Sequence, residues 1–330
     1  MSGSSGSHKT ATAPSTPIAN GQHYKRRYRP YFSKRQLSLM DQLNGFPSRR
    51  SHYAAAHSSN CKFIQQVGDK LGFPQTTIST SQALYHRFIL YQGSREFQSL
   101  DLCITALFVA SKMEENTKKL KDVYVVAHAL RYPKIQELDP EKVSDDRLSR
   151  VGDYERQMLE TLCFNFQIDH PYVYIVKFAK LLEKEFHIQG KSLAKKAYML
   201  AVDSYRTHLC LEYPSHTIAA GCLYLASLML EDMSYNSLRQ STFWTEKCFS
   251  RWVDIEEVGQ RILDIYIAKP SEFGPSQEYT NSKIVLNELA SQRPEQNNTH
   301  DKTKPWTIDA ALNLDDLIAH TSIDAVSYLI

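Results

Sequence analysis

The chain has 330 residues, of which 39 are Lys or Arg and 36 are Asp or Glu, so its formal net charge at pH 7 is only +3. A protein that binds nucleic acid along its whole length is strongly basic, so this balance of charges excludes that class. Hydrophobic residues make up 42% of the sequence, which is enough apolar material for two globular domains of ordinary size.

The two ends of the chain are polar and differ in charge from the middle. Residues 1–22 are rich in Ser, Thr, Ala and Pro, which predicts a disordered tail. Residues 23–57 form a basic N-terminal arm, and its first part, 23–35, has six Lys or Arg and no acidic residue. This pattern is typical of a nuclear-import or polyanion-binding segment, and equally of a solvated flank. Residues 269–330 are predicted to be a mostly disordered tail with a short helix near 308–329.

Between these tails, apolar residues recur every three or four positions without sustained alternation, so we expect an all-α fold. A first unit, residues 58–168, should contain five helices. The third of them is apolar nearly all round and must therefore be central. The expected helices are 60–71, 76–91, 99–115, 118–131 and 146–164.

A second unit, residues 169–268, repeats the first. A shift of 116 residues places 107–115 over 223–231 with mostly identical or similar residues, and both stretches belong to the third helix of their unit. This predicts two tandem five-helix units. The copies differ where Lys112 corresponds to Leu228, which indicates that this end of the first copy faces either solvent or a partner protein.

The segment from Ala110 to Asp122 resembles the A-x-K-x-E-E-T-P-K-K-x-K-D motif of transcriptional cyclins of the K and T type. His86, in His-Arg-Phe, favours this branch, because cell-cycle cyclins usually have aspartate there. We expect His86 to be a hydrogen-bonded residue on a helix flank and a family marker. Thr117 and Ser58 depart from the family, which commonly has proline and arginine at these places. Further segments that agree are 31–37, 63–68, 169–172 and 176–180.

The resemblance covers residues 30–268 and implies two tandem cyclin boxes in a regulatory subunit without catalytic residues. It implies binding and activation of a cyclin-dependent kinase that phosphorylates the RNA polymerase II C-terminal domain during elongation, as in fungal kinases of that domain. A third subunit, indirect association with RNA polymerase II, and a nuclear location, with the cytoplasm as a second one, are implied too. By similarity, the kinase-binding residues lie on the third and fifth helices: Phe108, Lys112, Met113, Glu115 and Glu155.

Motifs of other protein classes are missing from the sequence. It has no glycine-rich phosphate loop, G-x-S-x-G or H-E-x-x-H motif, and neither its 12 His nor its 6 Cys have close metal-ligand spacing. We therefore expect no enzyme activity, cofactor or metal site, and no membrane span. The alternative is a TFIIB-like cyclin-fold transcription factor that contacts DNA, but the zinc ribbon and basic faces that it needs are not visible, so DNA or RNA binding is not expected. A helical scaffold without a kinase partner is a third interpretation.

Overall fold

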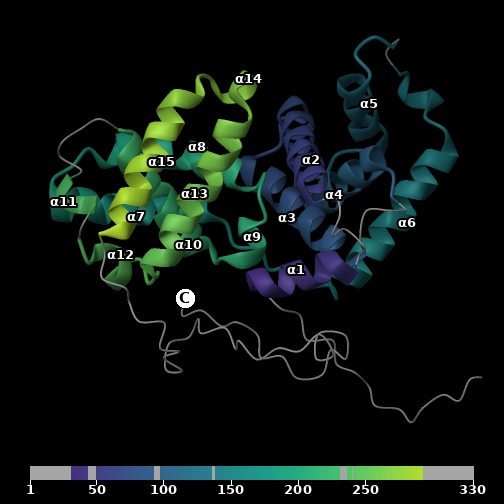
Figure 1. Cartoon of the computed structure of the whole chain (residues 1–330). Coiled ribbons are helices and arrows are strands. Elements are labelled where there is room, and N and C mark those ends of the chain that lie inside the picture. The colour runs from purple at the N-terminus through teal and green to yellow at the C-terminus, as the bar shows by residue number, and fades with distance from the viewer. Residues whose placement is uncertain are drawn as a thin grey trace, which may run out of the picture.

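The computed structural model describes residues 31–43, 50–92, 97–135, 138–230, 236–239 and 241–292, and the regular structure in these ranges is entirely helical (Figure 1). The predicted all-α fold is thus confirmed. Two helical units lie side by side, with α2–α6 in one and α7–α13 in the other. No helix within the described ranges is both long and apolar enough to cross a membrane.

The helices of the first unit follow the predicted order with ends within three residues of the prediction, except that α2 begins at Arg50, ten residues before the predicted start at 60. The first unit contains α2 (Arg50–Leu71), α3 (Gln75–Gln92), α4 (Ser99–Met113), α5 (Leu120–Arg131), η1 (Pro140–Lys142) and α6 (Asp145–Thr161). The second contains α7 (Pro171–Phe186), α8 (Gly190–Ser204), α9 (Leu209–Glu212), α10 (Ser215–Met229), α11 (Asn236–Arg239), α12 (Phe243–Glu246) and α13 (Trp252–Ala268). They are preceded by α1 (Lys34–Leu43) and followed by α14 (Pro270–Phe273) and α15 (Ser276–Ser291).

The internal repeat is visible in the helices themselves. The 116-residue shift carries α4 onto α10 with both bounds in register, Ser99 on Ser215 and Met113 on Met229. Each is the central helix of its unit: α4 packs against α2, α3, α5 and α6, and α10 packs against α7, α8 and α13. Ten of the 15 residues of α4 and 14 of the 15 residues of α10 are buried, as an apolar surface on nearly every side of a helix requires.

Helix α3 is buried over most of its length. Every residue from Thr77 to Leu90 is buried, including several polar ones. The helix has α2 and α4 on one side and the second unit on the other, and its polar groups bond across that boundary. Ser79 Oγ lies 2.6 Å from the Tyr172 hydroxyl, and Thr80 Oγ1 lies 2.9 Å from Nε2 of His170. The boundary between the units, called the seam below, is therefore polar as well as apolar.

The N-terminal arm closes one edge of the seam. The backbone N–H of Phe32 donates to the carbonyl of Leu211 at 2.8 Å, and the Phe32 ring is buried with Leu37, Leu90 and Leu211. Lys34 forms an ion pair with Glu257 of α13. Figure 1 shows α1 lying along both units. Thus part of the arm, 23–57, is helical and packed rather than a solvated flank, whereas 1–22 and 23–30 lie outside the described residues.

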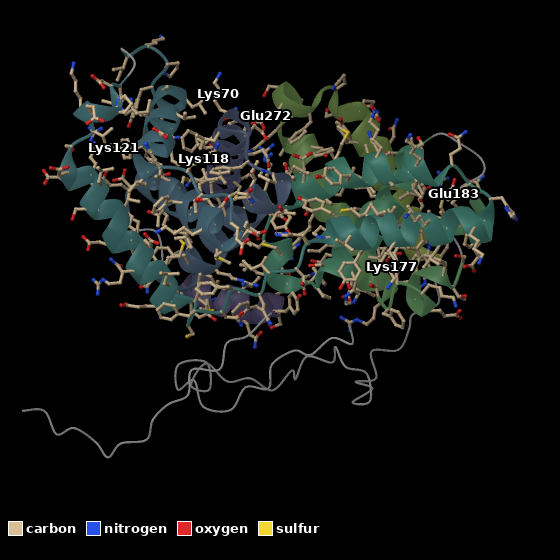
Figure 2. All side chains as sticks on the ribbon, turned by 180° about the vertical axis from the view of Figure 1, so that it is seen from behind. Lys70, Lys118, Lys121, Lys177, Glu183 and Glu272 are labelled. Atoms are coloured by element: carbon tan, nitrogen blue, oxygen red, sulfur yellow. The ribbon has the colours of Figure 1, made fainter. Side chains whose placement is uncertain are left out.

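Charged groups also join the units. Glu272 in α14 accepts a hydrogen bond from Arg206 at 2.8 Å and pairs with Lys62 of α2 at 3.3 Å, and Figure 2 shows it where the units meet. Lys269 donates to Ser58 Oγ at 2.9 Å. Ser58 replaces the arginine common in the resembling family, so here the second unit supplies a positive charge at this place.

The prediction that the tail is disordered is wrong for residues 270–291, which form α14 and α15. Helix α15 packs against α13 and α10, and Leu286 is fully buried. A Cβ on Gly259 of α13 would lie only 3.3 Å from Leu286 Cδ2, so the absence of a side chain there lets α15 approach closely. Few of its residues are buried, which explains why its polar sequence concealed it. The helix predicted near 308–329 lies outside the described residues.

Two glycines inside helices should respond oppositely to substitution by alanine. A Cβ on Gly221 would lie 2.6 Å from Val258 Cβ, so Gly221→Ala should lower the free energy of unfolding by about 1–3 kcal/mol through overpacking. Gly152 has nothing within 4 Å of that position, so Gly152→Ala should raise it by about 0.5–1 kcal/mol. Urea unfolding followed by circular dichroism measures both. Equal stability of Gly221→Ala and the parent chain would contradict the packing of α10 on α13.

Candidate functional site

The end of α4 and the middle of α6 present a charged pair at the surface of the first unit. Lys112 Nζ donates to Glu155 Oε1 at 2.6 Å, and the two side chains are 46% and 19% exposed. The same Nζ lies 4.1 Å from the centroid of the Phe108 ring, one helical turn earlier. The structure therefore brings together three of the residues named from the sequence, Phe108, Lys112 and Glu155. We call this surface the α4–α6 face.

The local sequence explains why the lysine stands there. Helix α4 ends at Met113, and Glu115 adopts a left-handed conformation with φ 56°, which turns the chain away. The N–H of Asn116 then bonds to the carbonyl of Ser111 at 2.8 Å, which satisfies one of the open helix-end carbonyls. Lys112, in the last turn, has the charge that a helix C-terminus favours.

The other two predicted residues occupy different surroundings. Met113 is half-buried and packs on the core of the first unit, and Glu115 is exposed in the turn after α4. Glu114 between them is tied inward, because Thr80 Oγ1 of α3 donates to its Oε1 at 2.7 Å. The end of α4 is thus anchored to the seam on one side while Lys112 faces outward on the other.

Sequence reasoning missed a stripe on α6 beside this pair. Leu148, Gly152, Glu155 and Leu159 are spaced by four, three and four residues, which places them along one side of the helix. The two leucines are half-buried and Gly152 is exposed. The stripe could have been found from this spacing, but a glycine in the middle of a helix carried no apolar signal.

His86 lies deeper than expected. It is 2% exposed, in the seam, and its Nε2 lies 2.8 Å from the backbone carbonyl of Tyr205. The predicted hydrogen bond is present, but the residue faces the second unit rather than a solvated flank. Burial lowers the pKa of His86 to about 4, against the opposing effect of the Tyr205 hydrogen bond, so the ring is neutral at physiological pH.

Two further histidines, His57 and His208, lie next to His86, although neither is close to it in the sequence. One ring nitrogen each of His57, His86 and His208 lies within 4.8 Å of the others. These three histidines are far apart in the sequence, and the fold brings them together because α2, α3 and the residue before α9 converge at the seam. Burial, with the neighbouring His208 and His86, holds the pKa of His57 well below its usual value.

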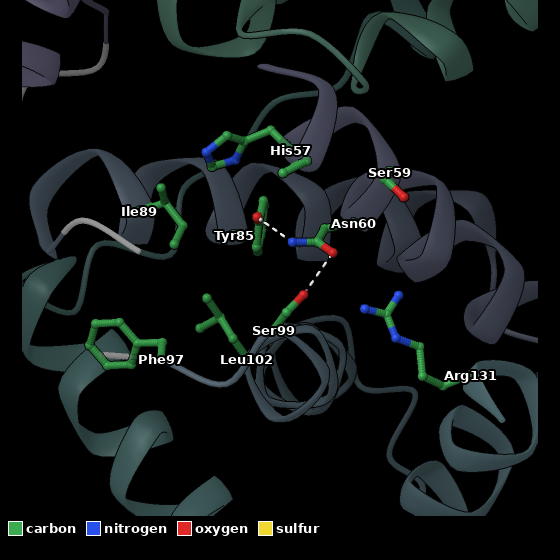
Figure 3. A pocket seen from close by; sticks show the side chains of 10 residues that line it. His57, Ser59, Asn60, Tyr85, Ile89, Phe97, Ser99, Leu102 and Arg131 are labelled. Atoms are coloured by element: carbon green, nitrogen blue, oxygen red, sulfur yellow. Dashed lines mark hydrogen bonds between the residues drawn. The ribbon is translucent and has the colours of Figure 1, made fainter. Parts of the chain in front are cut away.

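A cavity of about 350 Å³ adjoins this cluster (Figure 3). His57 lines it, and at its centre Asn60 donates to the Tyr85 hydroxyl and accepts from Ser99, both at 2.8 Å. Arg131 lines the cavity from the right of the picture and points toward Ser59 and Asn60. The lining combines aromatic, aliphatic, amide, hydroxyl and imidazole groups with this guanidinium.

Comparison with known proteins bears on the whole chain. Residues 29–167 match the family model described as "Cyclin, N-terminal domain". Human Cyclin-T2 is 34% identical over 203 residues, which are 59% of this chain and 27% of the relative. Cyclin-T1-3 of Oryza sativa is 28% identical over 80% of this chain and 54% of its own length. The CTD kinase subunit beta of Schizosaccharomyces pombe is 28% identical over 85% of this chain and 79% of its own length. The matched part of the chain thus spans about half of the length of Cyclin-T1-3 and about a quarter of the length of Cyclin-T2.

Solved structures agree on the fold. A chain of the crystal structure of the yeast RNA Pol II CTD kinase CTDK-1 complex superimposes with a TM-score of 0.62 at 20% identity, covering 82% of this chain and 92% of that one. A chain of the CAK complex from Chaetomium thermophilum has a TM-score of 0.54 at 13% identity, and the match covers 79% of this chain and 84% of that one. The helical fold is the one found in these chains. Residues 29–167 form a cyclin N-terminal domain.

Proposed function

We propose that this chain is the non-catalytic regulatory subunit of a cyclin-dependent kinase, which it binds through the α4–α6 face and activates. The observation that carries the proposal is the Lys112–Glu155 pair, which is exposed at the end of an otherwise buried helix. The equivalent helix α10 has Leu228 at the place of Lys112, partly buried against its own core. A polar, outward-facing end in only one of two duplicated helices is what a single docking surface requires.

The mechanism follows from how protein kinases are switched. An active kinase needs an ion pair between a strand lysine and a glutamate of its C-helix, and this helix must be held in place. A rigid surface that packs on the active position of the C-helix stabilises that state by differential affinity. The half-buried Phe108, Leu148 and Leu159 would supply apolar contact, and Lys112 and Glu155 would supply hydrogen bonds at its centre.

The substrate and location belong to the same proposal. We infer that the kinase phosphorylates the RNA polymerase II C-terminal domain during elongation, in the nucleus, within a complex that includes a third subunit and associates indirectly with the polymerase. The names of the Schizosaccharomyces pombe relative and of the yeast complex, both CTD kinases, support this. Purification of the chain from its own cells with mass spectrometry, and assay of the eluate on CTD repeat peptides, tests it. An eluate without kinase activity on these peptides would refute it.

Removing the charged pair should abolish activation without unfolding the chain. An exposed ion pair contributes at most about 1 kcal/mol to folding, whereas the same groups enclosed by a partner cost about 2–5 kcal/mol when truncated. Lys112→Ala with Glu155→Ala should therefore weaken kinase binding by about 30-fold or more and leave the circular dichroism spectrum unchanged. Surface plasmon resonance and kinase assay measure this.

The chain offers a matched control for this double variant. Lys121 and Glu141 form another Lys–Glu pair between separate elements, at 3.4 Å, and Figure 2 places Lys121 on the first unit away from the second. Lys121→Ala with Glu141→Ala removes the same charges outside the α4–α6 face and should keep full affinity. If both double variants bind the kinase like the parent chain, the assignment of the face is wrong.

Gly152 provides a steric test of the same face. Because nothing of the chain lies within 4 Å of a Cβ there, Gly152→Leu should fold normally. A kinase that packs along the α6 stripe would meet the added side chain, and we expect its affinity to fall about 5- to 150-fold, as for an overpacked contact of about 1–3 kcal/mol. Asp153→Leu, one exposed position further round the helix, is the control. Equal binding by both variants would exclude the stripe from the interface.

A further inference from the structure

We propose that His57, His86 and His208 form a binding site for a divalent transition-metal cation such as Zn²⁺ that ties the two cyclin boxes together. His57 on α2 and His86 on α3 come from the first box, and His208 precedes α9 in the second. One nitrogen of each lies within 4.8 Å of the others, and the ring centroids are 5.1–6.1 Å apart. A bound ion would therefore link residues far apart in sequence across the seam.

The environment of His86 is that of a metal ligand rather than of an ordinary core histidine. The backbone carbonyl of Tyr205 can only accept a hydrogen bond, so Nε2 of His86 carries the proton and donates to it at 2.8 Å. The other nitrogen, Nδ1, is then an acceptor, and it is buried without a hydrogen-bond partner. A histidine that donates one N–H to a backbone carbonyl and presents the other lone pair is the usual arrangement in zinc sites.

The protonation states also suit a cation. A neutral imidazole coordinates a metal through the nitrogen that carries no proton, which is Nδ1 in His86. Cys61 Sγ lies 3.2 Å from His86, but on the donating Nε2, so we do not count it among the ligands. Three imidazoles leave a fourth tetrahedral position for water or another ligand.

The distances require a small adjustment and allow entry. Two nitrogens bound to one zinc at about 2.1 Å are about 3.4 Å apart, so the rings must move together by roughly an ångström. His208 is half-buried and His57 lines the cavity of Figure 3, so an ion has a path from solvent. The alternative is that the three rings pack only as aromatic neighbours, which the same centroid distances also permit.

Metal titration of the full-length, untagged chain distinguishes these two cases. After treatment with a chelator, Zn²⁺ should bind at one ion per chain in competition with a chromophoric chelator, and should raise the melting temperature. Co²⁺ should produce the visible d–d absorption of a site with nitrogen ligands, a readout that needs no variant. Failure of the parent chain to bind either ion would overturn the proposal.

Variants locate the site. His208→Ala and His57→Gln should each weaken Zn²⁺ binding at least about tenfold, since even outer-shell changes cost 10–100-fold in metal affinity. His128→Ala removes another half-buried histidine, which lies on α5 outside the cluster, and should bind Zn²⁺ like the parent chain. Melting temperatures without metal identify any variant that fails to fold. If folded His208→Ala and His57→Gln bind zinc normally, the ion is held elsewhere and the proposal is wrong.

Discussion

The fold depends on one constraint, the burial of the fourteen consecutive residues Thr77–Leu90 of α3, several of which have polar side chains. Helix α3 belongs to both halves of the molecule: Leu84 is part of the first core, and Ala83, its neighbour, is part of the second. Ser79, Thr80 and His86 bond to residues of the second box. A buried polar group left unpaired costs about 1–3 kcal/mol, so any sliding of the boxes would break several bonds at once. Apolar packing alone would tolerate more displacement.

This constraint reaches the α4–α6 face through a chain of hydrogen bonds. Thr80 donates its hydroxyl hydrogen to Glu114 at 2.7 Å, so it accepts a hydrogen bond from Nε2 of His170. Burial lowers the pKa of His170 to about 4, so the neutral ring has no second N–H to donate. Its Nδ1 therefore accepts from the hydroxyl of Tyr205 in the second box at 2.6 Å. Glu114 follows Lys112 by two residues. The second box thereby holds the end of α4 without contacting the α4–α6 face, and a surface fixed before binding loses less entropy when a partner docks.

The duplicated helices α4 and α10 differ in what covers their C-terminal ends. In the second box, Arg239 of α11 donates to the carbonyls of Ser227 and Leu230, so short helices cover the end of α10. Leu228 and Leu230 pack against the core there. In the first box, the matching end of α4 carries Lys112, and α6 rather than a covering segment lies beside it. The two copies thus have equivalent central helices and differ at the helix end, which is covered in α10 and exposed at Lys112 in α4.

The sequence by itself determined the helical class, the duplication and the central helices, because apolar periodicity and a repeat of similar segments can be recognised without knowing which segments contact each other. It also indicated Lys112 and Glu155 through family resemblance. It could not reveal α15, whose burial depends on the absence of a side chain at Gly259, or Gly152, whose importance lies in the empty space above it. Nor could it bring His57, His86 and His208 together. Those features arise from contacts between distant segments, and only the packing of the two boxes against α3 decides which distant side chains meet.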